Sequence, residues 1–105
     1  MGGEQAVEIA ATSTEYVRVT ATSRIGGVAV NVAAPPKFAF LPASNTGNPA
    51  SGDWKTGEWN APHARILIGP SAGALTLTAG EYTVWLTWAA GAEVPVYRAG
   101  TLTVY

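Results

Sequence analysis

Apolar and polar side chains alternate along most of this chain. A repeat of two residues is typical of a β-strand that has one face in the protein core and the other toward solvent. The clearest example follows Gly80. One face of that segment carries four large side chains: Tyr82, Val84, Leu86 and Trp88. The other face carries Thr83, Trp85 and Thr87. No segment of any length has the three-to-four-residue spacing of a helix, so we predict an all-β protein.

Shorter segments of the same kind are separated by turn residues every eight to twelve residues or so, which is typical of a β-sandwich. We expect strands near residues 7–9, 16–21, 28–32, 37–41, 64–68, 75–77, 82–88 and 96–105. The length of 105 residues suits one immunoglobulin-like antiparallel β-sandwich of about seven strands, spanning residues 1–105 as a single domain. Residues 1–4 are expected to be flexible, and residues 42–63 to form a long surface loop with one short strand near Trp54.

The segment from Leu77 to Tyr82 has the spacing of a tyrosine corner, in which a tyrosine near the start of a late strand bonds to the backbone a few residues upstream. The alternative is a tyrosine that is simply part of the core. Either reading makes Tyr82 structural. We also assign Trp88, Phe38 and Phe40 to the core, because the first shares a face with Tyr82 and the two phenylalanines point the same way.

No residues are predicted to carry catalysis or to bind a metal or cofactor. Cysteine is absent, and the single histidine, His63, cannot supply a zinc ligand set. The seven acidic residues are spread singly, and the six basic residues form no cluster for nucleic acid or an anionic membrane. No apolar run approaches the roughly 20 residues of a membrane span, and the first residues lack the features of a signal peptide. We therefore expect no enzyme activity, no nucleic-acid or membrane binding, and synthesis in the cytoplasm.

Aromatic side chains are the unusual feature, since four tryptophans occur in 105 residues that are only 12% charged. Protein interfaces are enriched in aromatic residues and depleted of charge at their centre. The candidate interface residues are Trp54, Trp59, Trp85, Tyr97 and Tyr105. Trp85 is expected to be exposed or covered by a partner if the outer sheet faces solvent. Trp54 and Trp59 have three open readings: a plug at one end of the sandwich, anchors at a subunit interface, or a platform that stacks on sugars.

Several blocks of the sequence resemble small structural proteins of tailed bacteriophages, especially phages of actinobacteria. The blocks are residues 38–41, 52–55, 58–59, 65–70, 80–86 and 93–104. Wider relatives of this group include immunoglobulin-like domains of phage head, neck and baseplate proteins. The group offers no catalytic residues to carry over to this chain.

The resemblance implies a virion structural protein, made in the host cytoplasm and present in many copies. Capsid decoration or a head–tail (neck) accessory is the expected placement, with capsid, portal or tail subunits as partners and no cofactor. One alternative is a carbohydrate- or ligand-binding module for tail or baseplate adhesion, with a ligand bound through Trp54, Trp59 and the last hairpin. A further alternative, a secreted or surface adhesion domain, is weakened by the missing signal sequence.

Overall fold

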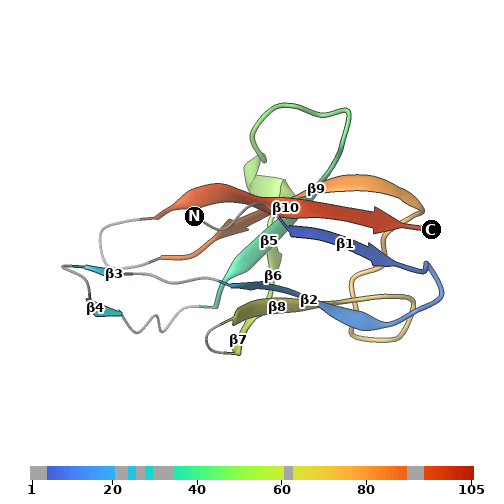
Figure 1. The fold of residues 1–105 in the computed structure, drawn as a ribbon, viewed down its shortest axis with the longest axis horizontal. Coiled ribbons are helices and arrows are strands. Elements are labelled where there is room, and N and C mark those ends of the chain that lie inside the picture. The colour runs from blue at the N-terminus through green and yellow to red at the C-terminus, as the bar shows by residue number, and fades with distance from the viewer. Residues whose placement is uncertain (1–4, 21–23, 26–27, 30–34, 61–62, 90–93) are drawn as a thin grey trace.

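The computed structural model describes residues 5–20, 24–25, 28–29, 35–60, 63–89 and 94–105, and these form two facing β-sheets (Figure 1). The larger sheet has five strands, in the order β1 (Gln5–Ile9), β10 (Val96–Val104), β9 (Gly80–Thr87), β5 (Lys37–Pro42) and β6 (Lys55–Thr56). The smaller sheet has three strands, in the order β2 (Glu15–Thr20), β8 (His63–Ile68) and β7 (Glu58–Asn60). A separate ribbon pairs β3 (Arg24–Ile25) with β4 (Val28–Ala29), and a 3-10 turn, η1, spans Ser51–Asp53.

The strand order confirms the predicted immunoglobulin-like sandwich. The run β10-β9-β5-β6 corresponds to the G, F, C and C′ strands of a variable-type domain, and β2-β8-β7 corresponds to B, E and D. Two details differ from the prediction. The first strand, β1, pairs parallel with β10, so the larger sheet is not wholly antiparallel. The strands are also more numerous and shorter than the seven expected, because several are only two or three residues long.

The central core lies between the two sheets, where the alternation places the apolar faces. The largest fully buried core side chains come from both sheets: Val17, Phe38, Ile68, Leu86 and Leu102. Phe38 and Phe40 lie with their rings nearly parallel and their centroids 6.1 Å apart, and Trp88 is buried in the same cluster. Burial of this apolar surface is the main force that holds the sheets together.

The predicted tyrosine corner is present. The hydroxyl group of Tyr82 donates a hydrogen bond of 2.7 Å to the carbonyl oxygen of Thr78 and lies 3.1 Å from the Thr78 hydroxyl oxygen. Val84 follows two residues later, at the position that holds the second disulfide cysteine in antibody domains. Here that position belongs to the apolar core, together with Val17 and Val19 of β2.

The stretch predicted as a long surface loop, residues 42–63, is a loop only in its first part. Strands β6 and β7 occupy residues 55–56 and 58–60, and between them the chain crosses from the larger sheet to the smaller one. Gly57 makes this crossing possible, because a β-carbon there would lie only 2.7 Å from both the Phe38 ring and the Arg65 carbonyl oxygen. Strand β6 lies where one short strand near Trp54 was expected, whereas β7 was not predicted because three residues are too few to show a period of two.

Two other expected strands differ from the structure. Residues 75–77 are not a strand, and only Leu75 forms an isolated bridge, to Ile68. Of the expected strand 28–32, the structure describes only β4, and the expected flexible residues 1–4 lie outside the described residues.

Candidate functional site

Two surface features bring together side chains that could recognise a partner: an apolar cluster on the outer face of the larger sheet, and a groove over the edge of β8. The outer-face cluster consists of Ala39, Leu41, Trp54 and Trp85. Its first two residues lie on β5, and Ala39 pairs directly with Trp85 of β9. These side chains face away from the central core, because they alternate with the inward-facing Phe38 and Phe40.

The chain's own loop covers this cluster. In residues 43–54, Asn45 Oδ1 accepts a 2.9 Å hydrogen bond from the Gly47 amide, and Asp53 Oδ2 accepts a 2.8 Å bond from the Ala50 amide. These local bonds shape the loop that leads through η1 to Trp54. Trp54 then packs on Trp85, which is only 9% exposed. The expectation that Trp85 is exposed or covered by a partner is therefore wrong, because residues of its own chain cover it.

The covered cluster continues into exposed apolar surface on β10. The guanidinium carbon of Arg98 lies 5.9 Å from the centre of the Trp85 ring. Val96, two residues before Arg98 in β10, pairs with Thr87. Val96 is 48% exposed and Val94 is 62% exposed. The Trp85 indole nitrogen, Nε1, is buried and has no hydrogen-bond partner among the residues that the structure describes. We call the patch of Val94, Val96 and Arg98 the β10 rim.

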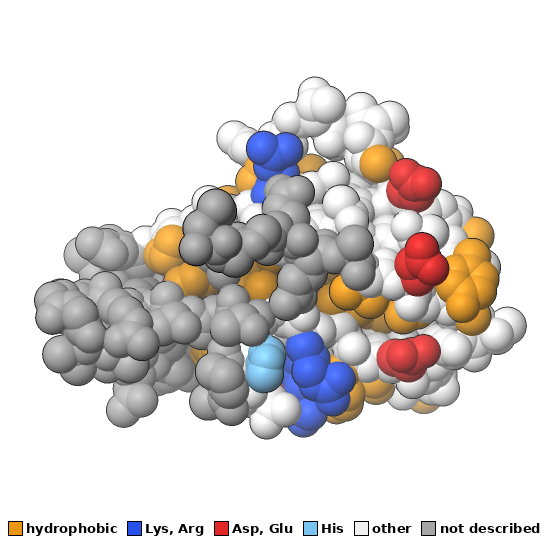
Figure 2. All heavy atoms as spheres, viewed as in Figure 1, with side chains coloured by type: hydrophobic (Ala, Val, Ile, Leu, Met, Phe, Trp, Pro, Cys, Tyr) orange, Lys and Arg blue, Asp and Glu red, His pale blue; other side chains and the backbone are white. Residues whose placement is uncertain are grey.

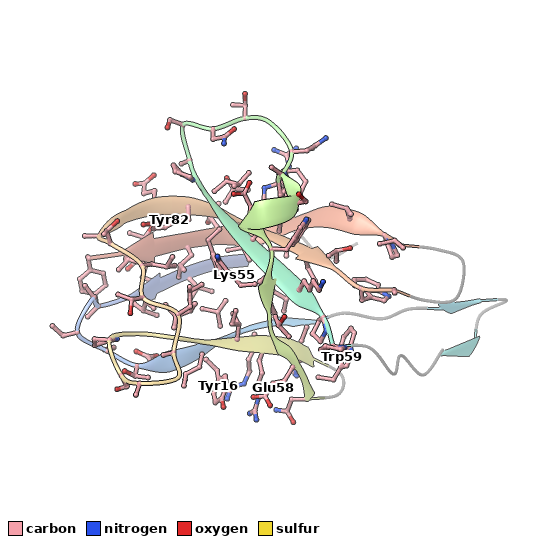
Figure 3. All side chains as sticks on the ribbon, turned by 180° about the vertical axis from the view of Figure 1, so that it is seen from behind. Tyr16, Lys55, Glu58, Trp59 and Tyr82 are labelled. Carbon is pink, nitrogen blue, oxygen red and sulfur yellow. The ribbon has the colours of Figure 1, made fainter. Side chains whose placement is uncertain are left out.

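The groove lies on the flank of the sandwich, where the chain crosses from β6 to β7, and has a volume of about 400 Å³. Its lining combines one aromatic ring, charged side chains and small residues: Tyr16, Lys55, Thr56, Gly57, Glu58, Arg65, Ile66, Leu67, Gly73, Ala74 and Leu75. Figure 3 shows Tyr16 and Glu58 together at the smaller sheet, with Lys55 above them on the strand that leaves the larger sheet.

The groove exists because the edge of β8 is only partly covered. Strand β7 pairs with β8 from His63 to Arg65, and Leu75 bridges to Ile68. The Leu75 amide donates to the Leu67 carbonyl oxygen at 2.9 Å, which closes that end of the edge. Between these two contacts no described strand pairs with β8 on this side.

Arg65 is held in place within the groove by two contacts. Its Nε donates a 3.0 Å hydrogen bond to Glu58 Oε1 across the β7–β8 pair. Its guanidinium carbon lies 4.0 Å from the centre of the Tyr16 ring, which is a cation–π contact. Arg18 approaches the same ring at 5.6 Å. The result is a positioned cation beside an exposed ammonium group, that of Lys55.

Acidic groups gather away from the groove. Glu8 and Glu81 both pair with Thr103 of β10, from opposite sides, so the three residues form a row across the sheet. Figure 2 shows acidic side chains at this end of the molecule and basic ones elsewhere. Glu58 is the exception among the described acidic residues, because it lines the groove beside Lys55 and Arg65.

The structure separates the residues that the sequence grouped as an interface. Trp54 belongs to the outer-face cluster, whereas Trp59 packs against the central core, with its ring edge-on to Trp88 at 6.1 Å. The two tryptophans thus share no platform. Tyr105 is 68% exposed. The Tyr97 backbone pairs with Leu86, and its side chain lies outside the described ones. A partner contact through these residues stays a prediction.

Sequence reasoning missed the groove residues. Tyr16 and Arg18 stand two apart on a predicted strand, and this spacing was the available sign that they share a face. Nothing in the sequence paired that face with Arg65 and Glu58, because their contact depends on strand pairing across some 45 residues of chain.

The described residues offer no arrangement for metal chemistry, since no three His, Asp or Glu side chains among them come together as ligands. No helix in the described ranges has the length and apolarity that a bilayer span requires. Comparison of the chain with protein-family models, with curated proteins and with solved structures finds no match.

Proposed function

We propose that this chain is a non-enzymatic structural subunit that acts through protein–protein contacts, and that it belongs to the virion of a tailed phage. The observation that carries the first part is the β10 rim. Val96 is exposed on the sheet face that carries the outer-face cluster, and Val94, two residues earlier in the chain, is exposed as well. Apolar surface that continues from a buried cluster into solvent is typical of a protein-binding site.

Low charge supports the same proposal. Only 12% of the residues are charged, and the outer-face cluster is followed along β9 and β10 by the paired, uncharged Thr83 and Thr101. Interface centres are depleted of charged residues, because each charge must lose its hydration when the partner binds.

The phage assignment rests on the sequence resemblance described above. It gives capsid decoration or a head–tail accessory as the placement, with capsid, portal or tail subunits as partners. The carbohydrate-binding alternative has no comparable support, because Trp54 and Trp59 lie in different clusters and cannot stack on one sugar chain.

The test is to purify particles of the phage that encodes this chain and to measure its copy number by quantitative mass spectrometry. A fixed stoichiometry with the major capsid or tail protein is expected. The variant Val96→Glu should reduce that copy number, because it buries a charge at the rim. Ala72→Glu adds the same charge at an exposed turn of the β8–β9 connection and serves as the control. Absence of the chain from particles, or equal incorporation of both variants, would contradict the proposal.

A further inference from the structure

We infer that the groove over the β8 edge binds an acidic side chain presented on a loop of a neighbouring protein subunit. This inference deepens the proposed function and rests on it, since it names the partner's chemistry at a surface distinct from the β10 rim. The groove is lined by Lys55 and Arg65 against the single carboxylate of Glu58. Its lining therefore carries a net positive charge, which favours an anionic group.

The shape of the groove favours a short segment of the partner over a whole strand. Glu58 of β7 and the bridge at Leu75 occupy the two ends of this edge, so an added strand cannot run along β8. What remains between these ends is a volume of about 400 Å³. A residue occupies on the order of 130 Å³ at the packing density of a protein interior, so the tip of a loop fits where a strand does not.

Small residues keep the groove open. Gly73 and Ala74 form one side of its lining. A β-carbon added at Gly73 would meet no atom within 4 Å, so its position faces open space. Ala74 itself lines the groove and is half-buried, so we expect a large side chain at this position to occupy groove volume.

The positioned arginine accounts for selectivity toward a carboxylate. The ion pair with Glu58 uses Nε, and the stack on Tyr16 fixes the guanidinium plane. The Nη groups make no ion pair with the described acidic residues and can donate to a second carboxylate. The exposed ammonium of Lys55 lines the same groove. A pre-positioned cation loses little side-chain entropy when the partner arrives.

A sugar ligand is disfavoured by the same geometry. Sugar rings bind proteins by stacking on a bare aromatic face, and Arg65 lies over the Tyr16 ring at 4.0 Å. Arg18 approaches that ring at 5.6 Å. Tyr16 therefore acts as a support for arginine and not as a stacking platform.

The first experiment titrates the isotope-labelled protein with a cyclic hexapeptide that carries one Glu at its turn, and follows backbone amide signals by NMR. The Glu peptide should shift the amides of Arg65, Leu67 and Leu75. The same peptide with Gln should bind at least about tenfold more weakly, because a charge-assisted hydrogen bond is lost. The Lys peptide should not bind. Absence of shifts with the Glu peptide, or equal shifts with the Lys peptide, overturns the inference. So does free glucuronate binding as tightly as the peptide.

Variants locate the binding. Lys55→Glu and Ala74→Trp should each abolish the shifts, the first by reversing charge and the second by filling the groove. Lys37→Glu is the matched control, because Lys37 is also exposed on the larger sheet but does not line the groove. Unchanged thermal unfolding shows that the variants still fold. Unaltered peptide binding by both groove variants overturns the inference.

Particle incorporation separates this inference from the proposed function. If the wild-type chain is missing from particles, the proposed function fails and the peptide titration alone decides the inference. If the wild-type chain is present and Lys55→Glu is incorporated as well as Lys37→Glu, the inference is overturned while the proposed function stands.

Discussion

The hydroxyl group of Tyr82 donates a 2.7 Å hydrogen bond to the carbonyl oxygen of Thr78, four residues earlier, where the chain enters β9. Gly80 lies between them with a φ of +152°, a conformation that a residue with a β-carbon rarely adopts. The bond therefore fixes the direction in which the chain joins the larger sheet. Because the Tyr82 ring also packs on the central core, one side chain links the turn to the interior.

Tyr82→Phe should lower the free energy of unfolding by about 1 kcal/mol, the usual net value of one hydrogen bond. The ring and its core contacts remain, so the fold should be retained, with an unchanged circular dichroism spectrum. Urea unfolding measures the difference. Tyr105→Phe is the control, since Tyr105 is 68% exposed and should change stability by less than about 0.5 kcal/mol. Equal stability of the two variants would show that the corner contributes nothing.

Gly57→Ala should destabilise the protein by about 1–3 kcal/mol, because the added methyl group lies 2.7 Å from the Phe38 ring and the Arg65 carbonyl oxygen. Both neighbours belong to paired strands and cannot move away freely. Thermal and urea unfolding are the measurements. Gly52→Ala provides the control, since no atom lies within 4 Å of a β-carbon there. A neutral result at Gly57 would mean that the crossing between the sheets is looser than described.

Trp85→Ala should cost about 3–5 kcal/mol, the usual range for removal of a buried tryptophan. Trp85→Phe should cost far less, roughly 1 kcal/mol, since it keeps an aromatic ring under Trp54. It also removes the buried indole N–H that has no partner among the described residues. Urea unfolding compares the two variants. Similar losses for Ala and Phe would contradict this account of the outer-face cluster.

Glu58→Ala and Arg65→Ala should be coupled, with a double-mutant coupling energy of about 0.3–1 kcal/mol that falls when salt is raised to 1 M. Arg65→Ala should be the costlier single change, because it also removes the stack on Tyr16. The same cycle with Arg18 in place of Arg65 should be additive, as Arg18 forms no ion pair with Glu58 in the described structure. Salt-independent coupling would argue against an ion pair.

The alternation of apolar and polar residues predicted those strands that bury one face and are long enough for the alternation to be recognised. The segment of β8 from His63 to Ile68 alternates in burial throughout, and its sequence showed this. Burial does not alternate at the end of β9. Trp85 and Thr87 on the outer face are buried there, as is Leu86 on the inner face. The covering comes from the loop at residues 43–54, which lies some 30–40 residues away in sequence.

The groove is formed by strand pairing between distant segments, which no local sequence pattern predicts. Arg65 meets Tyr16 only because β2 and β8 pair in one particular register, and a shift of one residue would place it on the other face. Its ion pair needs β7, a strand of three residues. Local patterns therefore could not predict that these side chains contact one another.

The parallel pairing of β1 with β10 sets the order of events when the chain folds. Val7 and Leu102 are neighbours, yet almost the entire chain lies between them. Closing so large a loop costs entropy that is regained only after the last strand is available, so this sheet cannot be completed until residue 104 has left the ribosome. Folding should accordingly be slow, with β9 and β10 forming a hairpin first and β1 joining their free edge last.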